Sequence, residues 1–107
     1  MRIKTSELTG VALDWAVAKA DGHDMDHFQV VDAYQPSTDW AQGGPIIERE
    51  VISVVEHQGK DYVWFAWEKY AKNRNCTANG PTILITAMRC YVASKLGYEI
   101  DVPEELL

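Results

Sequence analysis

The chain has 107 residues and a formal net charge of −6 at pH 7, with 16 acidic side chains against 10 lysines and arginines. One hydrophobic core is feasible at this length, so we expect a single domain over residues 1–107. The negative charge opposes attraction to phosphate backbones, which argues against duplex DNA as a partner. No apolar run approaches the roughly 20 residues that cross a bilayer, and the N-terminus lacks a signal-peptide pattern. We therefore expect a cytoplasmic protein with no membrane partner.

The first part of the chain predicts a short strand followed by a helix. Residues 1–4 can form the strand. Apolar residues then recur at helical spacing, which predicts a main helix over about residues 5–21. Thr5 or Ser6 can cap its start, and Gly22 can end it.

The next part predicts one strand and a turn-rich connection. β-Branched residues favour a strand over residues 28–34, and Pro36 ends it. In the connection we expect a single helical turn over residues 39–42. Pro45 suits the first position of another turn, which would continue to Glu50.

A β-hairpin is predicted after this connection. Residues 51–56 and 61–67 have strand patterns and are joined by a turn around Gly59. Trp64 and Phe65 point to opposite faces of the second strand, so we expect that strand to be central or covered on both faces. The polar residues from 68 to 80 are predicted as a loop.

The last main helix is predicted over about residues 81–96, with Gly97 as its stop. Apolar residues surround much of it, so we expect it to be heavily buried. Residues 98–102 can add a short strand before an acidic tail. Two main helices with mostly consecutive, hairpin-like strands predict an α+β fold with a small, mostly antiparallel sheet.

A first candidate binding segment lies in the turn-rich connection. A Trp offers a flat stacking face and one N–H donor, and two glycines let the backbone approach a ligand. Asp and Gln side chains can fix hydrogen-bond polarity at a base or sugar edge. A tight turn with a core-anchoring Trp would use the same residues, so both interpretations stay open. The candidate residues are Asp39, Trp40, Gln42, Gly43, Gly44 and Pro45.

A second candidate segment opens the last predicted helix and contains Asn79, Gly80, Pro81 and Thr82. Free backbone N–H groups and the helix dipole favour a phosphate or carboxylate there, and the Thr82 hydroxyl can add a donor. The segment is not a P-loop, because the lysine and the full glycine spacing are absent. Many helices begin this way for structural reasons alone. Only the fold can decide whether the two segments lie together.

Metal and catalytic signatures are weak. His23 and His27 are four residues apart, but the acidic sequence around them predicts a solvated loop, so we expect no metal site. Cys76 and Cys90 are expected to be thiols, with Cys90 a small buried residue. The G-x-S-x-G and H-E-x-x-H motifs are absent, so we identify no catalytic residue and expect no cofactor.

The tryptophan content is high for a chain of this length, with four residues. We expect two or three of them in the core and one or two along a groove. Stacking of an aromatic side chain on a base contributes about 1–3 kcal/mol. The residues are Trp15, Trp40, Trp64 and Trp67.

Three segments of the sequence resemble the NinX-like phage family, whose function is unknown. They are KTSELTGVALDWAVAKADG, STDWAQGGPIIERE and NGPTILITAMRCYVASKLG. The resemblance spans nearly the whole chain. It implies a phage-encoded cytoplasmic protein that acts inside a bacterium, from an accessory region of small early genes. It supplies no reaction and no catalytic residues.

These features favour a non-enzymatic binding protein. Our leading hypothesis is that it sequesters a nucleotide-like small molecule, such as a nucleotide immune signal, to counter host defence. The alternative is an acidic inhibitor or adaptor that docks on a host enzyme that handles DNA, because negative charge complements basic surfaces. A small nucleotide-metabolising enzyme is a third possibility. We also expect a homo-oligomer, because a second copy would add pocket walls.

Overall fold

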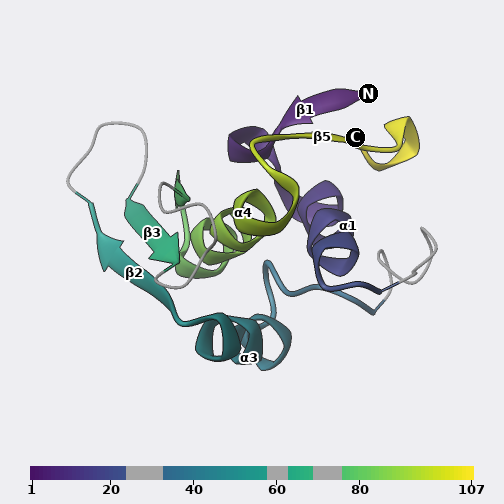
Figure 1. The fold of residues 1–107 in the computed structure, drawn as a ribbon. Helices are drawn as coiled ribbons and strands as arrows, with labels where there is room; N and C mark the ends of the chain where they lie inside the picture. The colour runs from purple at the N-terminus through teal and green to yellow at the C-terminus, as the bar shows by residue number, and fades with distance from the viewer. Residues whose placement is uncertain (24–32, 58–62, 69–75) are drawn as a thin grey trace.

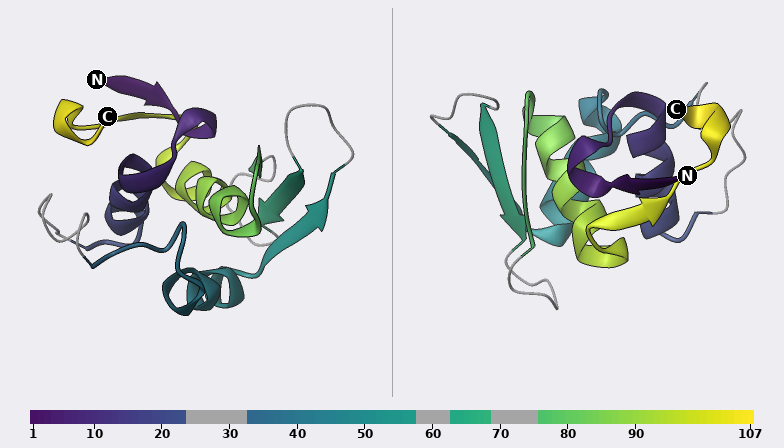
Figure 2. Two further views of the ribbon diagram at one scale, coloured as in Figure 1. Left: turned by 180° about the vertical axis from the view of Figure 1, so that it is seen from behind. Right: turned by 90° about the horizontal axis from the view of Figure 1, so that it is seen from above.

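Helix α4 (Ile83–Leu96) lies at the centre of the fold. Helix α1 (Gly10–Ala20) packs on one side of it, and a three-stranded sheet packs on the other (Figures 1 and 2). Helix α3 (Trp40–Glu50) lies below α4 in the view of Figure 1 and contacts it. The computed structural model describes four stretches of the chain, to which all statements about the fold refer: residues 1–23, 33–57, 63–68 and 76–107.

Both sheets are antiparallel. The larger one has the order β2–β3–β4, with β2 over Ile52–Glu56, β3 over Trp64–Glu68 and β4 over Thr77–Gly80. The smaller one pairs β1 (Arg2–Lys4) with β5 (Glu99–Asp101) and so brings the two ends of the chain together. Three helices with two antiparallel sheets confirm the predicted α+β class.

The first helix begins later than predicted. Residues Thr5–Glu7 form a short 3₁₀ helix, η1, and α1 starts only at Gly10, where φ is +55°. The Thr5 hydroxyl does not cap a helix. It donates a hydrogen bond to the Gly97 carbonyl at 2.7 Å, which ties η1 to the end of α4. A long-range contact therefore replaces the local cap that the sequence pattern suggested.

The predicted pair of short turns in the connection is one continuous helix, α3. The Asp39 carboxylate caps its start by accepting from the Ala41 N–H at 3.0 Å. The Gln42 side chain braces the turn, because its amide donates to the second carboxylate oxygen of Asp39 at 3.0 Å. Pro45 removes one hydrogen bond without ending the helix. Val51 ends it in the left-handed conformation, with φ of 53°.

Strand β4 was missed by the sequence reasoning, which placed a loop over residues 68–80. Its sequence, TANG, has little intrinsic strand preference. The strand forms because Thr77 to Gly80 pair with β3 on one edge. The Arg89 side chain contacts the other edge, where its Nη1 donates to the Asn79 carbonyl at 2.9 Å. Most of the predicted strand over 28–34 lies outside the described residues, and Ala33 and Tyr34 are not in a strand.

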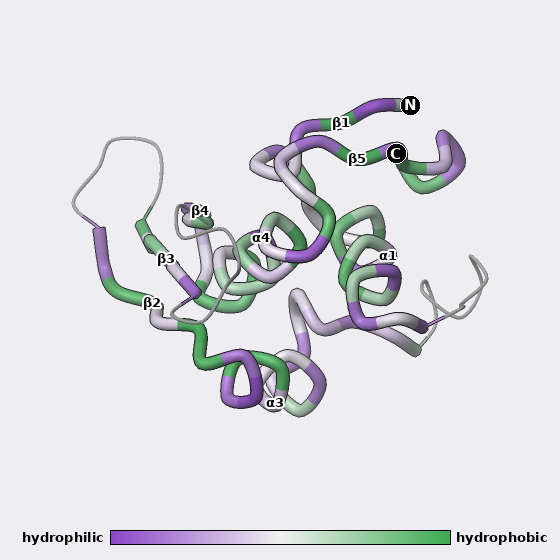
Figure 3. Tube along the Cα trace, in the orientation of Figure 1, coloured by the Kyte–Doolittle hydropathy of each residue, from purple (hydrophilic) through white to green (hydrophobic). Residues whose placement is uncertain are grey.

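The core surrounds α4, as the sequence predicted. Most residues from Leu84 to Ala93 are buried, including Met88, Cys90 and Val92. Figure 3 shows hydrophobic residues along α1, α4, β2 and β3, and buried residues of all four elements belong to one core cluster. None of the described helices is long and apolar enough to cross a membrane.

Strand β3 is central in its sheet, as expected, but only one of its faces is covered. Ala66 is fully buried on the face toward α4. Val63 and Trp67 lie on the opposite face and are 49% and 38% exposed. Of the two apolar faces of β3, one therefore packs against the core and the other is exposed.

Candidate functional site

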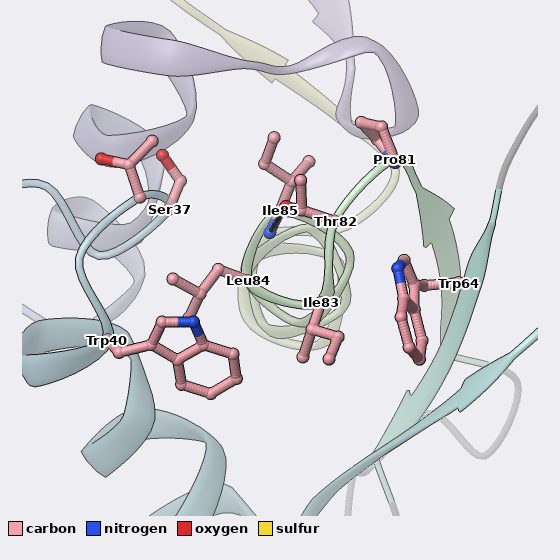
Figure 4. A pocket seen from close by; sticks show the side chains of 9 residues that line it. Ser37, Trp40, Trp64, Pro81, Thr82, Ile83, Leu84 and Ile85 are labelled. Atoms are coloured by element: carbon pink, nitrogen blue, oxygen red, sulfur yellow. Dashed lines mark hydrogen bonds between the residues drawn. The ribbon is translucent and has the colours of Figure 1, made fainter.

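A groove of about 400 Å³ lies at the N-terminal end of α4. Its walls come from three parts of the chain that are distant in sequence. Trp40 belongs to the first turn of α3, Trp64 to the start of β3, and Pro81 to Ile85 lead into α4 (Figure 4). Ser37 and Thr38, which precede α3, also line the groove. The groove exists only because α3 and the sheet both pack on α4.

Two indole rings flank this groove. Trp40 is 55% exposed, and in Figure 4 its ring lies on the opposite side of the Ile83 side chain from the ring of Trp64. Trp64 is half-buried, since it shares the inner face of β3 with Ala66. Exposure of a Trp beside a cavity leaves a flat stacking surface and an N–H donor for a ligand.

The polar part of the groove is the start of α4. The Thr82 Oγ1 caps the helix by accepting from the Ile85 N–H at 3.1 Å. The Thr82 carbonyl accepts from the Thr86 N–H at 3.0 Å and from the Thr86 hydroxyl at 2.6 Å. The backbone N–H groups of Ile83 and Leu84 belong to the first turn, which has no acceptor within the helix. Ile83 and Leu84 line the groove, and the free N–H groups and positive dipole at this helix end favour a negatively charged group there.

Most of the first predicted segment lies outside the groove. Its residues stabilise α3 and the loop before it. Gln42 accepts from the Gln35 N–H and donates to the Ala33 carbonyl, both at 2.9 Å, so it anchors the preceding loop. Gly43 is needed for packing, since a Cβ there would lie 2.3 Å from the Pro36 carbonyl oxygen. Gly44 has room for a Cβ at ordinary contact distance from Trp40.

Three more of the predicted residues have structural positions. Asp39 is the cap of α3, and Pro45 lies inside that helix. Gly80 is buried at the end of β4, where a Cβ would lie 2.8 Å from the Thr86 hydroxyl. Asn79 lines a different and smaller recess. Of the two predicted segments, the structure therefore brings Trp40, Pro81 and Thr82 to one groove.

The other lining residues were not among the two predicted segments, and they are Ser37, Thr38, Trp64, Ile83, Leu84 and Ile85. Trp64 was one of the four tryptophans expected in the core or along a groove, but only the register of β3 shows that its ring faces the start of α4. The expectation that two or three tryptophans belong to the core was wrong, because none of the four is buried. Trp15 comes nearest, since it is partly buried and packs against the core.

The comparison with protein families agrees with the resemblance in the sequence. The family model described as Bacteriophage P22, NinX matches residues 4–95. The chain belongs to this NinX family. The match includes α1, α3, the larger sheet and nearly all of α4, so the groove lies within the family's part of the chain. No curated protein matches the chain.

The opposite end of α4 in this NinX family member carries a compact polar cluster. Asp21 accepts from Arg49 at 2.7 Å and from the Tyr91 hydroxyl at 2.9 Å. Glu50 bonds to Arg49 at 2.9 Å and lies 3.4 Å from the Lys95 ammonium. Each charged group in this cluster has an oppositely charged partner, so the cluster joins three helices and leaves little for a ligand.

The pKa values in the cluster follow from these pairs. Partial burial acts to raise the pKa of Asp21, but the Tyr91 hydrogen bond and the Arg49 charge outweigh it and lower the pKa. The same competition between burial and the Arg49 and Lys95 partners lowers the pKa of Glu50. Glu68 differs, because burial raises its pKa and its Oε2 has no hydrogen-bond partner among the described residues.

Metal and thiol chemistry finds no support in the described part of the NinX chain. His23 contacts Asp21 at 3.1 Å, and the other residues of the acidic loop lie outside the described residues. No group of metal-ligating side chains forms among the residues that the structure describes. Cys76 and Cys90 are free and buried, and burial raises the pKa of Cys90 to about 12. Cys90 is therefore a packed core residue, as predicted.

Proposed function

We propose that this protein is a non-enzymatic binding protein that sequesters a nucleotide-like small molecule in the groove at the start of α4. The observation that carries the proposal is the meeting of Trp40, Trp64 and the first turn of α4 in one groove. In a phage-encoded protein, such binding would withhold a nucleotide signal of the host's defence from its receptor.

The groove suits a ligand with one flat end and one charged end. Its volume of about 400 Å³ lies in the range of small-molecule sites, roughly 300–1,000 Å³. A base would stack on Trp40 or Trp64, a contact that contributes about 1–3 kcal/mol. A phosphate would accept from the N–H groups of Ile83 and Leu84 at the positive end of the helix.

The residues that line the groove favour holding a ligand over transforming it. They are hydroxyl, aromatic, aliphatic and proline side chains, and none of those that the structure describes is acidic, basic, His or Cys. General acid–base catalysis needs a group that can transfer a proton near the operating pH. Ser37, Thr38 and Thr82 are the only hydroxyl groups in this described lining, and Thr82 is engaged as a helix cap.

A nucleotide panel tests the proposal. Thermal unfolding of the full chain would be measured with mono-, di- and cyclic nucleotides, and a true ligand should raise the midpoint temperature through mass action. A ligand at 100 times its Kd adds about 2.7 kcal/mol to the free energy of unfolding. Native mass spectrometry would then give the stoichiometry and the oligomeric state. Chromatography of the nucleotide after incubation would detect turnover.

Two tryptophan variants make this test specific. Trp40→Ala should abolish the stabilisation by ligand and leave the midpoint without ligand nearly unchanged, because the ring is 55% exposed. Trp67→Ala is the matched control, since it removes an exposed indole from the outer face of the sheet. If no nucleotide stabilises the wild-type chain, or if both variants respond like it, the groove is not a nucleotide site.

A second candidate function, an inhibitor or adaptor of a host protein, is favoured by the outer face of the larger sheet. Val55, Val63 and Trp67 are 43%, 49% and 38% exposed there. Apolar side chains gathered on one face are typical of protein-binding surfaces, and the charge of −6 would complement a basic partner. In this case Trp67→Ala would lose capture of a host protein, and Trp40→Ala would keep it.

A further inference from the structure

A buried arginine without a carboxylate partner lies on the side of α4 that faces η1 and β4. Arg89 is only 8% exposed. Its Nε donates to the Leu8 carbonyl at 2.8 Å, and its Nη1 donates to the Asn79 carbonyl at 2.9 Å. Among the described residues no acidic group lies within ion-pair distance of it, and burial lowers its pKa. Neutral carbonyls satisfy two donors, but they do not neutralise the positive charge.

The guanidinium of Arg89 lines a small recess. The recess has a volume of about 100 Å³, which is room for a few water molecules or one small oxyanion. Ser6 and Thr77 supply hydroxyl groups to its lining, and none of its described lining residues is acidic. A guanidinium has five N–H donors, and no hydrogen bond from Arg89 Nη2 occurs within the described parts of the chain. The recess thus combines a desolvated cation with open donors.

Two more cations lie beside this recess. A second hollow, of about 550 Å³, shares Ser6 and Tyr98 with it and is lined by Arg2 and Lys4. Arg2 lies 3.8 Å from Glu99 and 3.6 Å from Asp101, and all three side chains are more than half exposed, so solvent weakens these pairs. Arg2 and Lys4 therefore add positive charge near Ser6, and Glu99 in the same lining offsets part of it, so Arg89 is the cation on which the site depends.

We propose that the recess at Arg89 binds a small oxyanion, either a phosphate group or a carboxylate. Arg89 is the anchor, because a guanidinium binds both groups through charge-assisted, often bidentate hydrogen bonds. The Ser6 hydroxyl is a second donor at the mouth. The site is separate from the tryptophan groove, since the described linings of the two have no residue in common. It does not depend on the proposed function of that groove.

Anion titration of the full chain tests this site. Thermal unfolding would be measured with rising inorganic phosphate, and separately with acetate, with NaCl holding the ionic strength constant. We expect a saturable rise in the midpoint temperature and a shift of the Arg89 Nε–H signal in ¹H–¹⁵N spectra. A response to phosphate but not acetate assigns a phosphate site, and the reverse assigns a carboxylate site.

The variants separate this site from general salt effects. Arg89→Lys should weaken binding by about tenfold or more, because an ammonium lacks the planar fork. Lys19→Met and Trp40→Ala should respond like the wild-type chain, since the first removes an exposed charge elsewhere and the second alters only the other groove. An equal rise in all variants would overturn the proposal. So would the lack of any midpoint or Arg89 Nε–H response to both anions.

Arg89 also joins α4 to Leu8 and β4, so its replacement could unfold the chain. Ser6→Glu avoids this problem, because Ser6 is exposed in η1, whose buried residue is Thr5. A carboxylate there would act as a built-in counter-ion for Arg89. We expect it to raise the midpoint temperature without added anion and to abolish the response to phosphate. A full response in Ser6→Glu would contradict the assignment.

Discussion

The two ends of α4 use their polar groups in opposite ways. At its C-terminal end, Asp21, Arg49 and Tyr91 bond to one another at 2.7–3.2 Å and join three helices. At its N-terminal end, the backbone donors of the first turn open into a neutral groove beside the exposed ring of Trp40. The first arrangement is complete without a ligand. The second leaves donors and a stacking surface available, so we propose that a ligand binds at that end.

This contrast shows how a structural polar cluster differs from a candidate site. Charge alone would have pointed to the C-terminal end of α4, where acidic and basic groups gather. Their partners are already present, and paired groups lower each other's electrostatic free energy without a ligand. None of the described residues that line the tryptophan groove is charged, but the ring of Trp40 is exposed there. Three substitutions can test this division, and they are ordered by the size of the expected effect.

The largest effect is expected at Gly43, next to the groove wall. Gly43→Ala would place a Cβ 2.3 Å from the Pro36 carbonyl oxygen and 2.7 Å from Leu84 Cδ2. Such overpacking costs about 1–3 kcal/mol in the free energy of unfolding, measured by urea denaturation. Gly44→Ala is the control, because its Cβ would meet Trp40 at 3.8 Å, and alanine favours a helix. If Gly43→Ala reduced ligand binding without loss of stability, Gly43 would belong to the site.

A smaller loss is expected at the paired end of α4. Tyr91→Phe removes the hydroxyl that donates to Asp21 and accepts from Arg49, which should cost about 1–2 kcal/mol at pH 7. The pKa of Asp21 is lowered in the fold, so the stability from its charge is complete above pH 3.8 and is lost as pH falls through the folded pKa. The free energy of unfolding that Tyr91→Phe loses, measured by urea denaturation, should therefore be smaller at acid pH than at pH 7.

Tyr34→Phe is the control for this pH dependence. Burial, with the nearby Asp21 and Asp14 charges, raises the pKa of Tyr34 to about 12, so its hydroxyl stays neutral across the range studied. The free energy of unfolding that Tyr34→Phe loses should be the same at neutral and acid pH. An equal cost of Tyr91→Phe at both pH values would mean that the Asp21 contact is not a stabilising charged pair.

The smallest effect, a gain, is expected at Glu68. Burial raises the pKa of Glu68, so the protonated carboxyl stabilises the folded chain below pH 4.5. This contribution to the free energy of unfolding is lost as pH rises through the folded pKa. Glu68→Gln should then stabilise the chain at pH 7 by roughly 0.5–1 kcal/mol and have less effect at pH 4. Thermal unfolding at the two pH values measures the difference. A loss at pH 7 would show that the ionised carboxylate has a stabilising partner.

Local patterns predicted much of the fold. The apolar surroundings of α4 and the strand patterns of β2 and β3 each depend on neighbouring residues, and these elements were predicted. The predicted turn around Gly59 lies outside the described residues. The elements that were missed depend on distant contacts. Strand β4 needs pairing with β3 and the bond from Arg89, and neither is visible in the sequence TANG.

The candidate site was predictable only in part. Trp40 and Thr82 were identified by residue type, and both line the groove. Gly43 was assigned to a ligand because glycines permit close backbone approach, but the approaching backbone is that of Pro36. Trp64 could not be placed, because its direction depends on the alternation within β3 and on the packing of the sheet against α4.

The most direct measurement of the central claim uses the four tryptophans as reporters. Each gives one indole N–H signal in a ¹H–¹⁵N spectrum, assigned by single Trp→Phe variants. On titration with the nucleotide that stabilises the chain most, the signals of Trp40 and Trp64 should shift together and saturate. Those of Trp15 and Trp67, which do not line the groove, should stay in place. Shifts at Trp67 with no change at Trp40 and Trp64 would contradict binding at the start of α4.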